Sequence, residues 1–218
     1  MPSDPILDER IRDPHLISTI ADEGLSEEVV SQIFLETLRQ FFMNPDNFSV
    51  RRMRDRNPPL VWSPKEEETK VRILRDIDWV PENMGQTPEI IIRSQGTEWQ
   101  AINNQAGIDD YYISGEAPDR IGSMVTGRIV VWSISPSGEE SRMIGWELGT
   151  FFDAFSQPFC REWGFYTVRP AGVGGPARIR ERKGYWGTPL VIGYQWQLSQ
   201  EVTEQKPVLA EIKTRTTY

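Results

Sequence analysis

The chain has few of the side chains that most often carry catalysis or bind metals near neutral pH. Its 218 residues include one cysteine, Cys160, and one histidine, His15. A single cysteine excludes an internal disulfide. Cys160 and His15 together also provide only two of the four ligands of a structural zinc site. Catalytic triads need a histidine, and we interpret His15 as an exposed residue of a polar N-terminal stretch. We expect Cys160 to be a small, at least half-buried hydrophobe.

Long apolar runs are also missing. No run approaches the roughly 20 residues that a membrane span needs. The first residues have neither the basic nor the apolar region of a signal peptide. We therefore expect a soluble protein made in a reducing compartment, with no membrane partner and no cofactor. The net charge is −8, from 24 basic and 32 acidic residues.

Aromatic residues, by contrast, are plentiful, and many of them follow helical spacing. The chain has 8 Trp, 6 Tyr and 9 Phe. Ser26, followed by two glutamates, is a typical helix start. The stripe of the first helix, which should end at Asn44-Pro45, is Val29, Val30, Ile33, Phe34, Leu38, Phe41 and Phe42. Ser137 begins a second amphipathic helix, which Pro158 should break or kink.

Alternating apolar and polar residues predict the strands. We expect strands at 71–80, 88–93, 97–102 (returning after a turn at Gly96), 123–135, 164–169, 190–198 and, near the end, 208–214. The sequence therefore predicts an α+β fold, with a largely antiparallel sheet carrying two main helices on one face. Long loops and extended terminal arms complete it. We divide the chain into an N-terminal arm (1–24), one α+β domain (25–200) and a C-terminal tail (201–218).

Two basic segments stand out in an acidic chain. Residues 51–56 carry a net charge of +3 and include Arg51, Arg52 and Arg54. Residues 169–183 carry +4, and their basic residues are Arg169, Arg178, Arg180, Arg182 and Lys183. We interpret residues 170–188 as a glycine-rich, basic loop. Residues 103–120 form an acidic, turn-rich stretch that contains Asp109 and Asp110. Such segments are candidates for contact with a partner or with nucleic acid, although solvated turns have the same composition.

Three motifs resemble catalytic or ligand sites without completing one. Residues 172–177 match the pattern GxGxxA, but no amphipathic helix follows, so we interpret them as a flexible loop. Asp109-Asp110 has the carboxylates that suit Mg²⁺, with nothing nearby to complete a shell. Glu211-Ile-Lys213 has the ExK spacing of metal-dependent nucleases, yet acidic partners lie far upstream and the order of helices differs. We therefore expect no enzyme, and keep a nuclease or other DNA-processing enzyme as the alternative.

The order of elements resembles the tail-terminator, or tail-completion, proteins of tailed bacteriophages. The likeness covers roughly 26–198, and the stretches that carry it are 34–42, 79–93, 127–155, 164–166 and 188–196. It implies a structural virion protein, assembled in the host cytoplasm into a ring, usually a hexamer. Such a ring caps the tail tube, stops its polymerisation and joins the tail to the head connector. The family offers no catalytic residues to transfer.

The resemblance also implies partners and a way of meeting them. The partners would be further copies of the chain, the tail tube protein, neck or connector proteins and possibly a sheath, with DNA passing through the lumen. We hypothesise that the acidic 103–120 segment of one subunit meets the basic 169–183 segment of the next. A head-completion or stopper protein of the connector is the alternative within the same class.

Overall fold

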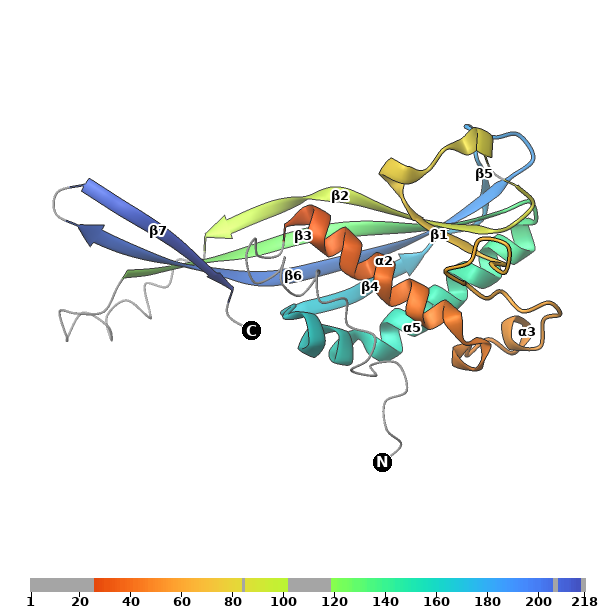
Figure 1. The fold of residues 1–218 in the computed structure, drawn as a ribbon, viewed down its shortest axis with the longest axis horizontal. Coiled ribbons are helices and arrows are strands. Elements are labelled where there is room, and N and C mark those ends of the chain that lie inside the picture. The colour runs from red at the N-terminus through yellow and green to blue at the C-terminus, as the bar shows by residue number, and fades with distance from the viewer. Residues whose placement is uncertain (1–25, 84, 102–118, 206–207, 217–218) are drawn as a thin grey trace, which may run out of the picture.

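The computed structural model describes residues 26–83, 85–101, 119–205 and 208–216 (Figure 1). Its helices are α2 (Glu27–Met43), α3 (Arg51–Arg54) and α5 (Gly138–Trp163), with short 3₁₀ turns at Pro45–Asn47, Asp76–Asp78 and Pro81–Asn83. Its strands are β1 (Arg72–Arg75), β2 (Glu89–Ala101), β3 (Asp119–Ser135), β4 (Thr167–Val173), β5 (Ala177–Arg178), β6 (Trp186–Gln205) and β7 (Val208–Thr216). The predicted α+β class is confirmed.

One mixed sheet contains all of these strands. Its order is β1-β2-β3-β6-β4, with β5 and β7 also paired to β6. The β1–β2 pair is parallel and the other pairs are antiparallel. β4 and β7 pair with the same strand at different heights, β4 opposite Leu190–Gln195 and β7 opposite Leu198–Gln205.

Both long helices pack on one face of this sheet, α2 over β1 and β2, and α5 over β3, β6 and β4 (Figure 1). Phenylalanines join the two helices to each other: the ring centroids of Phe34 and Phe152 are 5.3 Å apart, and those of Phe41 and Phe151 are 4.3 Å apart. Beneath them lie the inward residues of the strands, among them Ile90, Ile129 and Ile192. Burial of this apolar area is the main term that stabilises the fold.

Helix ends follow the predicted chemistry in part. The Ser26 hydroxyl accepts a hydrogen bond from the backbone N–H of Val29 at 3.3 Å, and Ser137 accepts one from that of Glu140 at 3.4 Å. Of the two outcomes expected at Pro158, a break or a kink, the break is wrong, because α5 continues through Pro158 to Trp163. Gly164, at φ 73°, ends the helix in the left-handed conformation that glycine adopts without strain.

Three strand predictions need correction. Residues 88–102 are not a hairpin: β2 runs on through Gly96, which at φ 89° takes part in an irregularity of register between Ser94 and Thr97. In the predicted 71–80 strand only Arg72–Arg75 is extended, and a 3₁₀ turn follows. Residues 170–188 are not one loop, because they include the end of β4, all of β5 and the start of β6.

The far ends of β2, β3 and β6, together with β7, reach well beyond the helices (Figure 1). We call this part the strand extension and define it as Thr97–Ala101, Asp119–Gly127, Tyr194–Gln205 and β7. The last strand, expected near 208–214, is present as β7. At its base Val125, Tyr194 and Trp196 still belong to the main core. Beyond them the extension is a ribbon of strands that no described helix covers, so it offers surface to other molecules.

Candidate interaction surfaces

The basic 169–183 segment serves partly to cover the face of the sheet that has no helices. The guanidinium of Arg182 lies over the ring of Tyr185, 4.7 Å from its centroid, and donates to the carbonyl oxygen of Pro81 at 2.6 Å. The Tyr185 hydroxyl donates to the carbonyl of Gly85 at 2.7 Å. These contacts fasten the 178–185 strap to the 76–88 segment.

Beneath this strap lies a second, smaller apolar cluster. Ile91 and Ile134 form its buried centre, and the residues packed against them are Leu74, Trp79, Trp132, Ile179 and Tyr185. Glu89 borders it with no exposed surface, accepting from Trp79 Nε1–H at 2.9 Å and from Arg72 at 2.9 Å. Burial raises the pKa of the Glu89 carboxyl, a shift that its bonds to Trp79 and Arg72 oppose. The contacts of Arg182 with Tyr185 and Pro81 thus give it a structural role within the chain.

The remaining basic side chains of the segment face solvent. Arg180 and Lys183 are exposed, and Arg178 is exposed while stacking on Trp186 at 5.2 Å from the ring centroid. Arg169 lies apart from them on β4. The five predicted basic residues are thus divided between the 178–185 strap and β4, the last strand in the order of the sheet.

Arg169 has a neighbour that the charge pattern did not single out. Gly193 on β6 is the register partner of Arg128 on β3 and of Arg169 on β4, so both arginines share one face of the sheet. It is the helix-free face, because Ile129 and Val168, one residue away, are in the main core. A Cβ added to Gly193 would meet nothing within 4 Å. Two exposed cations therefore flank an open strip of strand.

Arg128 was missed as a site residue because it is an isolated charge in an apolar stretch. The period-two alternation of 123–135 places Arg128 on one face with Thr126, Val130 and Trp132. The opposite face carries Val125, Ile129 and Val131, which are buried. Only the registers of β3 and of β4 against β6, the strand between them, bring Arg128 and Arg169 together.

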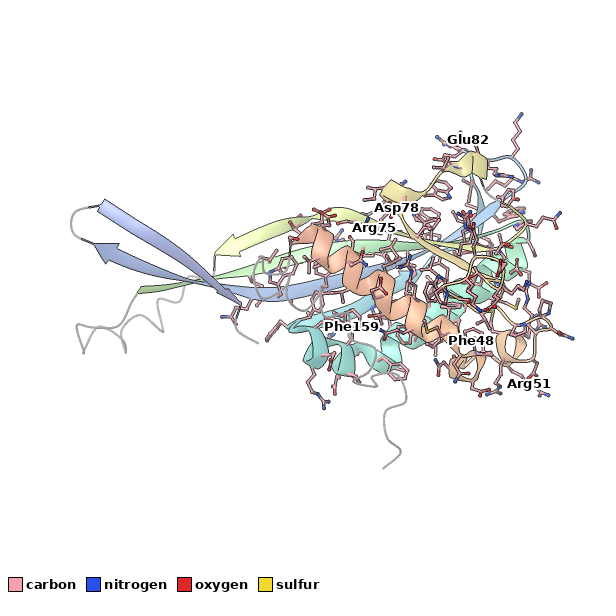
Figure 2. The ribbon with its side chains drawn as sticks, viewed as in Figure 1. Phe48, Arg51, Arg75, Asp78, Glu82 and Phe159 are labelled. Atoms are coloured by element: carbon pink, nitrogen blue, oxygen red, sulfur yellow. The ribbon has the colours of Figure 1, made fainter. Side chains whose placement is uncertain are left out.

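The basic 51–56 segment is held against the first turn of α5. Arg52 pairs with Glu139 at 2.7 Å, Arg56 pairs with Glu140, and Arg51 pairs with Asp55 at 3.0 Å within its own turn. Arg54 is exposed. Arg51 is the first residue of α3, which lies at the outer end of the body (Figure 2). Much of this +3 charge is thus compensated within the chain, which lowers its value as an anion-binding surface.

The acidic candidates cannot be placed in the same way. Asp109 and Asp110 lie outside the described residues, as does His15, so the hypothesis of an acidic segment meeting the basic one stays a prediction. Glu211 and Lys213 lie on β7 at register positions opposite Thr203 and Glu201 of β6.

Groups suited to chemistry are dispersed in the described part of the chain. Its ranges hold no group of three or more His, Cys, Asp or Glu side chains placed to bind a metal ion. Cys160 is half-buried on α5, as expected, and burial raises the pKa of its thiol above the usual value, which disfavours the nucleophilic thiolate. Within those ranges no helix is both long and apolar enough to cross a membrane.

Large apolar side chains also reach solvent outside the basic segments. Trp146 on α5 is 58% exposed and Tyr166, just before β4, is 70% exposed. Ile77 and Val80, in the 76–88 segment, are exposed too. Tryptophan and tyrosine are enriched among residues that carry binding energy at protein interfaces.

No protein-family model and no curated protein sequence matches this chain.

Proposed function

We propose that this chain is a structural subunit of a bacteriophage virion, a tail terminator or a closely related neck component that assembles into a ring. In this role the ring caps the tail tube, stops its polymerisation and joins the tail to the head connector. Its contacts are with further copies of itself, the tail tube protein and connector proteins. The sheath of a contractile tail is a further candidate partner, and DNA passes through the lumen.

The observation that carries the proposal is the strand extension. It reaches past the helix layer that covers the rest of the sheet (Figure 1). Strands need an apolar face or a covering helix for independent stability in water. No described helix covers the outer part of this ribbon (Figure 1), and free strand edges favour association. An extension of this kind is expected in a subunit that is completed by its neighbours.

Two further features support an assembly role over catalysis. Exposed aromatic side chains, Trp146 and Tyr166, provide the groups that dominate protein interfaces. The order of elements on which the resemblance to tail terminators rests, a helix, strands, a long strand, a second helix and further strands, is also the order of elements in the fold. A stopper protein on the connector side remains the alternative within this class.

An assembly assay tests this function. Purified full-length chain is added to tail tube protein during tube polymerisation, and tube lengths and ends are recorded by electron microscopy. We expect ring-shaped caps at one end of the tubes and a length distribution cut short in proportion to the amount added. Rings that bind only isolated connectors would favour the stopper alternative. Uncapped tubes of unchanged length, with no binding to connectors, would contradict both.

A further inference from the structure

The strand extension has two free edges on opposite sides. On the outer side of β2, β1 pairs only with Glu89–Ile92, and no other described strand continues that edge to Ala101. On the other side, β7 pairs with β6 and with no further strand among the described residues. Unpaired backbone N–H and C=O groups of such edges are templates for another strand.

These two edges run in opposite directions. The steps from β2 to β3, from β3 to β6 and from β6 to β7 are all antiparallel. Three such steps reverse the direction, so β7 is antiparallel to β2. A second copy related by rotation about an axis to which the strands are inclined by about 35–45°, as in closed barrels, keeps the same up or down sense along that axis. Its β2 would therefore meet β7 of the first copy in the antiparallel sense, continuing the alternation of the sheet.

We propose that β7 of one copy pairs with the free edge of β2 in the next, head to tail, so that the extensions form a continuous intersubunit sheet. This inference rests on the proposed ring, since a head-to-tail contact closes only by rotation. The occupant of each edge is thus a second copy of this chain, which supplies the complementary edge.

The heights of the two edges set the displacement between copies. β7 lies opposite Leu198–Gln205 of β6, whereas Thr97–Ala101 of β2 is level, through β3, with Tyr194–Leu198. Without a shift along the strands, the two edges would meet only at their ends, Ala101 of β2 and Thr216 of β7. In closed barrels strands tilt by about 35–45°, so across four strands the register climbs by about 13–19 Å, or about four to six residues. A displacement of that size, in the direction that moves Thr97–Ala101 toward the level of Leu198–Gln205, lays this segment along β7.

The irregularity in β2 limits the contact to the same residues. The register shift between Ser94 and Thr97, with Gly96 at φ 89°, interrupts the strand just before the proposed segment. Bulges of this kind hinder the pairing of an edge. Pairing is therefore expected from Thr97 onward, where β2 is regular against β3.

The register predicts which residues meet. Only an even displacement keeps the pleats of the two copies in phase. With a displacement of four residues Glu98 faces Arg215, and with six it faces Lys213. Thr214, between them, is out of phase and is the matched control. Gln197, which is exposed on the interior strand β6, is the control for Glu98.

Disulfide trapping tests the pairing in the full chain carrying Cys160→Ser. Glu98→Cys is combined in turn with Lys213→Cys, Arg215→Cys or Thr214→Cys, then oxidised or treated with a short bis-maleimide. We expect one of the first two pairs to give a ladder of covalent multimers ending at the closed ring. At least tenfold less covalent multimer is expected from the controls. These are Glu98→Cys with Thr214→Cys, each single variant, and Gln197→Cys with Lys213→Cys or Arg215→Cys.

The outcomes separate this inference from the proposed function. Rings visible by electron microscopy without a ladder from any pair would overturn the strand pairing and leave the ring in place. Dimers from a single β7 variant would show two-fold pairing of β7 with itself, which also overturns it. A wild-type chain that stays monomeric would overturn both proposals.

Hydrogen exchange of the unmodified chain provides a reading that does not depend on variants folding. The amides of Thr97–Ala101 on the free edge should exchange at least tenfold more slowly in the ring than in dissociated subunits. Equal exchange in the two states would contradict the proposed pairing.

Discussion

The Glu147 carboxylate on α5 accepts hydrogen bonds from the backbone N–H groups of Ser49 and Val50, both at 2.7 Å, and one from the Ser49 hydroxyl at 3.1 Å. Glu147 is only 1% exposed. A single buried side chain thus satisfies two backbone donors of the segment that precedes α3. It also fixes that basic segment against the second helix, where Arg52 and Arg56 then find their partners.

Replacement of Glu147 should destabilise the fold. In Glu147→Gln, one side-chain amide replaces an acceptor that faces backbone donors, leaving at least one partly buried N–H without a partner. We expect a loss of about 1–3 kcal/mol in the free energy of unfolding, measured by chemical denaturation. Glu139→Gln, which removes an exposed ion pair, should change it by less than about 1 kcal/mol. Equal effects of the two variants would contradict the role assigned to Glu147.

Replacement by alanine should have opposite effects on stability at Gly127 and at Gly193, two glycines of the central strands β3 and β6. A methyl group on Gly127 would overlap the ring and hydroxyl of Tyr194, a fully buried residue, whereas one on Gly193 meets open space. Gly127→Ala should therefore cost about 1–3 kcal/mol of stability through overpacking. Gly193→Ala should cost nothing and could add up to about 1 kcal/mol, because it restricts the unfolded chain. Thermal denaturation of both variants tests this contrast, which fails if Gly193→Ala is the more harmful.

The buried carboxyl of Glu89 makes stability depend on pH. Burial raises its folded-state pKa above the usual 4.5, so folding favours the protonated form. Its contribution is complete below the unfolded pKa and is lost as pH rises through the folded one. Glu89→Gln cannot ionise, so the stability of this variant relative to wild type should increase from pH 4 to pH 8. Denaturation at a series of pH values measures this difference. A change in the opposite direction would mean that the Arg72 ion pair lowers the pKa instead.

The surface of the strap predicts which charges matter for assembly. Arg180 and Lys183 are exposed, whereas Arg182 is tied to Pro81. If the basic strap meets the acidic 103–120 segment of a neighbour, Arg180→Glu with Lys183→Glu should weaken ring formation at least fivefold, without changing the melting temperature.

Rescue distinguishes that contact from a general charge effect. Asp109→Lys with Asp110→Lys should restore ring formation in the reversed strap variant. The same reversal at Arg54, at the other basic segment, is the control and should leave assembly unchanged. Rings that form equally well from all variants, as followed by mass photometry, would refute the charge contact.

The parts of the fold that local chemistry determines were predictable from sequence. The Ser26 cap and the apolar stripe of α2 specify one helix, and alternation placed most of β3 and the middle of β6. The extent of β2 was not predictable, since Gly96 is typical of a turn as well as of an irregular strand. Nor was the role of Arg182 visible, because its partners, Pro81 and the Tyr185 ring, come together only in the folded chain. Arg128 becomes a candidate only through its register with Gly193 and Arg169.

The central claim is that the full chain forms a ring, and its native mass tests this most directly. Native mass spectrometry or mass photometry of the purified protein at micromolar concentration should give one closed stoichiometry, with a hexamer as the expectation from the resemblance. Electron microscopy class averages of the same sample should show a ring with an open lumen. A monomer at every concentration, or an open series of sizes with no closed form, would contradict the account.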